Sequence, residues 1–176
     1  MTPRLVDTPV LETERLTLRA FGAQDLPAAV AFFTTDRAQF VGGGADKDET
    51  HAFRVLSILI GHWVINGFGT FAAVEKSTGA TVGAFGPWFP KGWPEREIGW
   101  SLWRTEDEGK GLATEAARAT LAYAFNALGW QTAVSYIAPA NHASQAVAGR
   151  LDAVRDASAT PPGAGTLVFR HPKGAA

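Results

Sequence analysis

One segment constrains this 176-residue chain more than any other: residues 95–114, EREIGWSLWRTEDEGKGLAT. Its first half alternates apolar with polar or small residues, which predicts a half-buried strand. A polar loop that ends in Gly109 and Gly111 follows. The alanine-rich stretch after it predicts a long helix over 111–128. A strand, a glycine loop and a helix must therefore follow one another directly.

This order of elements predicts an anion site at the start of the helix. The first N–H groups of a helix have no acceptor inside it, and its dipole is positive at that end. Because glycine has no Cβ, Gly109 and Gly111 let phosphate oxygens approach the backbone closely.

Two common phosphate motifs do not fit the loop. A Walker A loop requires glycine where Arg104 stands and Ser or Thr where Gly111 stands. A dinucleotide fingerprint requires Gly or Ala where Thr114 stands. A nucleotide-binding kinase or a dehydrogenase is therefore disfavoured.

Composition excludes further classes. The 16 basic and 17 acidic residues give a net charge of −1, without the basic excess of a nucleic-acid binder. The chain has no cysteine, so disulfides, thiolate metal sites and cysteine nucleophiles are excluded. The histidines show no metal-ligand spacing, and no metal is expected. No signal peptide or apolar run of membrane-spanning length is visible, so we expect a cytoplasmic protein that binds no membrane.

Periodicity along the whole chain predicts an α/β protein with a mixed sheet. Strands and helices follow the order βαα, then βββ, then αβαββ, so a meander precedes a β-α-β crossover. No linker or repeat divides the chain, and its length suits one domain over residues 1–176.

The loop resembles a known family. Residues 108–113, Glu-Gly-Lys-Gly-Leu-Ala, are similar to the pyrophosphate loop of GNAT N-acetyltransferases, Arg/Gln-x-x-Gly-x-Gly/Ala, and match it at Gly111 and Ala113. Glu108 departs from the pattern. The continuation through Ala116 resembles the RimJ/RimL branch of that family. Further segments that resemble this branch are 11–19, 97–100, 139–144 and 168–172.

The resemblance implies a fold and a cosubstrate. The fold is a twisted, mostly antiparallel sheet of about seven strands with a splay between strands 4 and 5 and about four flanking helices. The cosubstrate is acetyl-CoA. The residues implied to bind it are Leu102 and Trp103 beside the pantetheine arm, Gly109, Lys110, Gly111, Ala113 and Thr114 at the pyrophosphate, and Asn141 at the arm. Asn141 also suits a helix N-cap.

Direct transfer to an amine requires a base and a proton donor for the leaving thiolate. The resemblance implies Glu97 as the base and Ser144 as the donor. Glu95 and a chain of waters are the alternatives for the base. The tyrosine that many relatives carry is Ala148 here, and the usual Leu-Gly-Phe after the last long helix reads Leu-Asp-Ala at 151–153.

The acceptor is expected to be a small primary amine or a protein N-terminus. Trp88 and Trp93 could wall its pocket, while Glu95 with Glu97 could attract a cationic amine. The resemblance also allows a homodimer. A non-catalytic acyl-CoA-binding module of the same fold is the alternative function.

Overall fold

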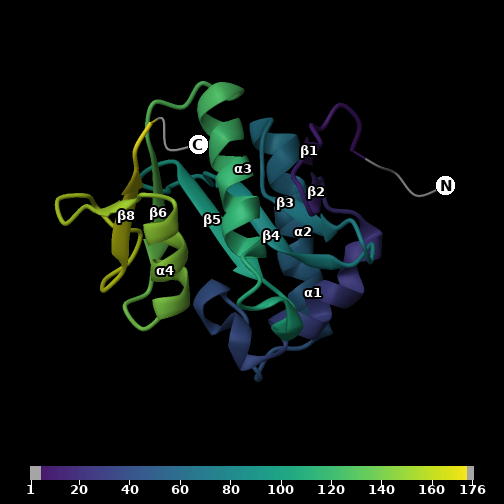
Figure 1. The fold of residues 1–176 in the computed structure, drawn as a ribbon. Coiled ribbons are helices and arrows are strands. Elements are labelled where there is room, and N and C mark those ends of the chain that lie inside the picture. Colours follow the sequence, from purple (N-terminus) through teal and green to yellow (C-terminus); the bar gives the residue numbers. More distant parts are fainter. Residues whose placement is uncertain (1–4, 174–176) are drawn as a thin grey trace.

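One eight-stranded sheet with four α-helices organises the structure, a computed structural model that describes residues 5–173 (Figure 1). The strands, in the spatial order β1-β2-β3-β4-β5-β6-β8-β7, are β1 (Leu11–Glu12), β2 (Leu16–Arg19), β3 (Phe71–Glu75), β4 (Thr81–Trp88), β5 (Glu97–Leu102), β6 (Ala133–Ile137), β7 (Val154–Arg155) and β8 (Leu167–His171). The α-helices are α1 (Leu26–Phe33), α2 (Glu49–Asn66), α3 (Leu112–Asn126) and α4 (His142–Arg150). Short 3-10 helices are η1 (Ala23–Asp25), η2 (Asp36–Val41) and η3 (Thr105–Asp107).

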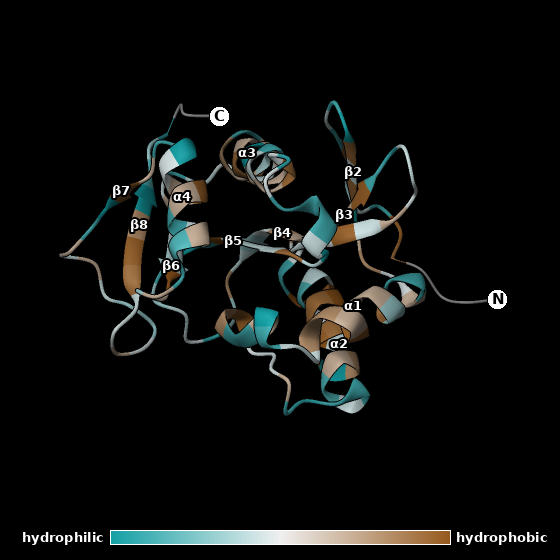
Figure 2. Ribbon diagram, turned by 60° about the horizontal axis from the view of Figure 1, so that its bottom comes forward, coloured by the Kyte–Doolittle hydropathy of each residue, from teal (hydrophilic) through white to brown (hydrophobic). Residues whose placement is uncertain are grey.

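The helices cover both faces of the sheet. Helices α1 and α2 lie on one face, and α3 and α4 on the other (Figures 1 and 2). Their apolar sides and the sheet residues between them form the core, where Leu16, Phe71, Phe85 and Leu121 are fully buried. Within residues 5–173, no helix has the length and apolar composition needed to cross a bilayer.

The mixed sheet predicted from the sequence is confirmed, with one strand more than expected. Leu11 and Glu12 form the short strand β1, which pairs with Leu18 and Thr17 of β2. The strands expected as the fourth and fifth are therefore β5 and β6.

The expected splay lies between β5 and β6. These strands run parallel and pair at one position, Glu97 opposite Val134, whereas every other neighbouring pair is antiparallel. Next to that position, the buried Ser135 Oγ donates to the Ile98 carbonyl at 2.6 Å and lies 2.8 Å from His171 Nε2. A side chain thus satisfies a carbonyl that the neighbouring strand no longer reaches.

Helix α4 ends in a way that explains one departure from the family pattern. Asp152 has a φ of +58°, the left-handed conformation that usually favours glycine after a helix. Aspartate is one of the few other residues that tolerate it. Ala148, which stands where relatives carry tyrosine, is fully buried.

Replacing Ser135 tests the hydrogen bond at the splay. In Ser135→Ala, the buried Ile98 carbonyl and His171 Nε2 lose their partner, so we expect the free energy of unfolding to fall by about 2 kcal/mol in urea denaturation. The control is Ser57→Ala, because Ser57 is exposed and bonds only within its own helix, to Phe53. Equal stability of the two variants would contradict the prediction.

Candidate active site

The loop before α3 presents its backbone to open space. Gly109 and Gly111 have φ of +74° and +81°, which residues with a side chain rarely adopt. A Cβ at Gly109 would meet nothing within 4 Å, and one at Gly111 only Nη2 of Arg15 at 3.6 Å. The first backbone hydrogen bond of α3 runs from Glu115 N to Gly111 O at 3.1 Å. The N–H groups of residues 112–114 therefore have no acceptor within the helix.

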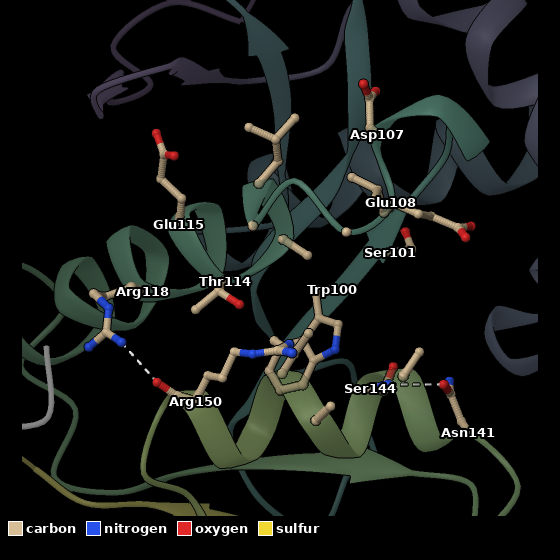
Figure 3. A pocket seen from close by; sticks show the side chains of 18 of the residues that line it. Trp100, Ser101, Asp107, Glu108, Thr114, Glu115, Arg118, Asn141, Ser144 and Arg150 are labelled. Atoms are coloured by element: carbon tan, nitrogen blue, oxygen red, sulfur yellow. Dashed lines mark hydrogen bonds between the residues drawn. The ribbon is translucent and has the colours of Figure 1, made fainter.

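A cavity of about 1180 Å³ lies against this loop. In Figure 3, α3 and its loop lie on one side of the cavity and α4 on the other, with Trp100 of β5 between them. This cavity is lined by most of the residues that were expected to bind the cofactor, namely Leu102, Gly109, Gly111, Ala113, Thr114 and Asn141.

Two arginines that sequence reasoning missed line the same cavity. Arg118 lies on α3 and Arg150 at the end of α4, and Arg118 Nη2 donates to the Arg150 carbonyl at 2.8 Å. Figure 3 places both at the opposite end of the cavity from Glu108. A signal for Arg118 was available, because it stands four residues after Thr114 and so shares a helix face with it.

Glu108, the departure from the family's loop pattern, has a counterion. Its Oε1 lies 2.6 Å from Nη2 of Arg37, which belongs to η2. The same guanidinium donates to the carbonyls of Leu102 and Trp103. Arg37 therefore ties the end of β5 to the loop and offsets the negative charge that Glu108 brings to the cavity.

Trp103 and Lys110 were also expected to bind the cofactor. Neither residue lines this cavity or the cavity that adjoins it. Trp103 is buried. Its backbone N–H donates to the Val82 carbonyl at 2.8 Å, and its backbone carbonyl accepts from Arg37. Lys110 turns its ammonium toward Asp107, at 3.4 Å. Both are engaged by the protein itself.

A second cavity of about 530 Å³ adjoins the first. Trp100, Ser101, Asn141 and Ser144 line both cavities, so the two meet where β5 and β6 separate. The second cavity is lined by three residues expected at the acceptor or the base, namely Trp88, Trp93 and Glu97.

The carboxyl group of Glu97 has an unusual environment. Its Oε2 accepts from Trp93 Nε1 at 2.7 Å, and the Tyr136 backbone also hydrogen-bonds to it. Burial outweighs these bonds and raises the pKa of Glu97 from 4.5 to about 7. A carboxyl with this pKa can take or release a proton near neutral pH.

Glu95, expected beside Glu97 at the acceptor, lies elsewhere. Its two oxygens accept from Arg170 Nη1 and Nη2 at 2.8 and 2.9 Å, and it lines neither cavity. Arg170 also pairs with Asp156 at 2.7 Å. The charge of Glu95 is thus neutralised within a bidentate ion pair.

Asn141 and Ser144 open α4 at the junction of the cavities. Asn141 Oδ1 accepts from Ser144 N at 3.1 Å, which confirms Asn141 as the N-cap (Figure 3). The cap fixes the first turn of α4, and with it the position of Ser144 beside both cavities.

The raised pKa of Glu97 predicts a pH-dependent stability. Because the folded protein holds this proton more tightly than the unfolded chain, the contribution of Glu97 to stability is largest below pH 4.5 and is lost as the pH rises through about 7. Relative to Glu97→Gln, the wild type should lose about 2–3 kcal/mol of unfolding free energy over this range in urea denaturation.

Comparing the wild type with Glu97→Gln also removes the opposite pH dependence that His171 contributes to stability. Burial lowers the pKa of His171 to about 4, so His171 destabilises the fold as the pH falls below 6.5. That effect is present in both proteins and cancels in their difference. A difference that does not vary with pH would show that the Glu97 pKa is not raised.

Comparison with known proteins identifies the family of this chain. Residues 15–154 match the family described as acetyltransferase (GNAT) domain. An acetyltransferase from Agrobacterium tumefaciens is 34% identical, with a TM-score of 0.86 over 98% of this chain and 99% of that one.

Two more distant structures share the fold alone. A GNAT-family acetyltransferase from Bacillus anthracis is 23% identical, with a TM-score of 0.72 over 92% and 97% of the two chains. A ribosomal-protein-S5-alanine acetyltransferase from Vibrio fischeri is 18% identical, with a TM-score of 0.67 over 94% and 97%. The family match and the Agrobacterium relative together show that this chain belongs to the GNAT acetyltransferases and is an acyltransferase.

Proposed function

We propose that this protein transfers the acetyl group of acetyl-CoA to a primary amine. The observation that carries the proposal is the continuity of two cavities, one against the N–H groups of the glycine loop and one against Glu97. A donor and an acceptor held in these cavities would meet between β5 and β6.

The first cavity suits a pyrophosphate and a long, flexible arm. The N–H groups of Gly109, Gly111 and residues 112–114 would face the phosphate oxygens, where no Cβ obstructs them. Arg118 and Arg150 add positive charge to the same cavity. Leu102 and Asn141 would lie along the arm. When bound, acetyl-CoA supplies an acetyl thioester.

In the second cavity, Glu97 would accept the proton that the ammonium group of the acceptor must lose before its nitrogen attacks. A base with a pKa near 7 can do so at neutral pH and release the proton again to water. Ser144, at the junction, would donate a proton to the departing thiolate. Trp88 and Trp93 would wall the acceptor.

Binding of acetyl-CoA tests the loop assignment. Calorimetric titration should show micromolar affinity for acetyl-CoA and none for ATP or NAD. We expect Gly111→Leu to weaken binding by about 100-fold or more, because its side chain would occupy the space reserved for phosphate.

The matched control for that variant is Gly79→Leu. Gly79 has a similar φ of +71° and open surroundings, but it lies in the turn before β4 and lines neither cavity. The two variants therefore carry the same backbone strain. If both bound acetyl-CoA equally well, the loop assignment would be wrong.

Turnover tests the two catalytic assignments. Glu97→Gln should lower kcat/KM by about 10²- to 10⁴-fold and abolish the rise in kcat/KM through pH 7. Ser144→Ala should lower kcat by about tenfold while acetyl-CoA affinity is retained. Glu14→Gln, on an exposed residue that lines neither cavity, serves as the control.

Two outcomes would contradict these assignments. Full activity of Glu97→Gln would favour a base made of waters. Tight binding of acetyl-CoA without transfer to any amine would favour the alternative of a non-catalytic acyl-CoA-binding module.

Several finer expectations stay predictions from the sequence. They are the RimJ/RimL branch, the cytoplasmic location, the homodimer, and the cofactor or acceptor roles of Trp103, Lys110 and Glu95. The ion pair with Arg170 supports a structural role for Glu95.

A further inference from the structure

The charge content of the acceptor cavity restricts what can enter it. Among the described residues 5–173, Glu97 is the only carboxylate that lines this cavity, and no lysine, arginine or histidine lines it. Its walls are mainly apolar and include Val55, Ile58 and Leu59 of α2. One acidic group thus faces an otherwise uncharged, largely apolar space.

One basic side chain, that of His62, lies behind this wall and is held neutral. The ring of His62 stacks on Trp88, with centroids 4.5 Å apart. The N–H of Phe89 donates to His62 Nε2 at 3.1 Å, and Nδ1 lies 2.8 Å from the Phe68 carbonyl. Nε2 is therefore an acceptor and Nδ1 carries the proton, which leaves no site for a second proton. Burial also lowers the pKa of His62.

A second basic side chain, that of Arg170, is bound to two acids. Arg170 holds Glu95 and Asp156 and lines neither cavity. A carboxylate on the acceptor would consequently enter the cavity with no positive partner, and a second ammonium would find no second acid. Either charge would lose its hydration without compensation.

We infer that the acceptor carries one ammonium group on an uncharged, largely apolar body. An arylalkylamine and the first residue of a peptide share this chemistry, whereas free amino acids and polyamines lack it. This inference rests on the proposed acetyl transfer and names the substrate class for it. The aromatic walls, with Trp93 and Tyr136 edge to face at 6.1 Å, suit an aromatic or branched apolar body.

A panel of related amines tests the inference on the wild-type protein with acetyl-CoA. It contains phenethylamine, phenylalaninamide, a short amidated peptide that begins with phenylalanine, phenylalanine and spermidine. The release of CoA is followed, and rates are normalised to the concentration of neutral amine. We expect kcat/KM for the first three to exceed those for phenylalanine and spermidine by about tenfold or more. A preference for the peptide or for the free amine identifies which source supplies the ligand, and both support the inference.

A positive charge added to the cavity should reduce the expected preference for phenethylamine over phenylalanine. Ile58 lines the cavity and is 58% exposed, so α2 can carry arginine there. Ile58→Arg should raise kcat/KM for phenylalanine relative to phenethylamine by several-fold, because the guanidinium can pair with the carboxylate. Ser57→Arg adds the same charge to the preceding residue of α2, which does not line the cavity, and should leave the ratio unchanged.

The possible failures are distinguishable. If the wild type prefers phenylalanine or spermidine, the inference is overturned while acetyl transfer stands. If acetyl-CoA binds but no amine in the panel is acetylated, the proposed function fails and the inference falls with it.

Discussion

The separation of β5 from β6 determines where every element of the site can lie. A parallel pair held at the single position Glu97–Val134 leaves backbone groups on both strands without a ladder partner. The protein satisfies one of them with Ser135, whose hydroxyl is in turn fixed by the buried His171. The strands can then diverge without an unsatisfied carbonyl at the point of departure. The second cavity opens at that point, and the first adjoins it further along β5, at Trp100 and Ser101.

The charges around the first cavity follow one pattern. Among the described residues 5–173, each acid that lines it is paired with a basic side chain: Glu108 with the distant Arg37, Glu115 with the distant Arg15, and Asp107 with Arg104, three residues before it. Such pairs are worth little as stabilising contacts when exposed. Their effect here is to cancel negative charge where a phosphate would bind. The loop N–H groups at the positive end of α3 then remain available to an anion.

The sequence predicted what is local and missed what is distant. Gly109, Gly111 and Thr114 could be predicted to lie together because the spacing of a loop and a helix start fixes their geometry within six residues, and all three line the first cavity. Trp103 was expected at the cofactor arm, and its indole N–H does donate to Ser101 Oγ at 3.0 Å, but its ring is buried against Phe21 and Phe32 and lines neither cavity. The pairing of Glu108 with Arg37 and of Glu95 with Arg170 spans 71 and 75 residues. No local pattern announces such a pair, although it decides which of two neighbouring acids faces a cavity.

The position of Glu97 on β5 constrains how it can serve as a base. The two cavities meet at Trp100 and Ser101, and a strand rises about 3.3 Å per residue. The Cα atom of Ser101 therefore lies about 13 Å from that of Glu97 along the strand. Because the Glu97 carboxyl reaches as far as Gly99, about 7 Å remain to Ser101, whereas direct proton transfer requires a separation of about 3 Å. An amine placed at the junction would release its proton to Glu97 through intervening water. Gly99 stands between them on the same face, and a Cβ there would meet only Glu97 Oε1 at 3.9 Å, so the strand leaves room for that water. The Glu97 carboxyl and a water chain, which are alternatives when only the sequence is considered, would in the proposed reaction be two parts of one proton path.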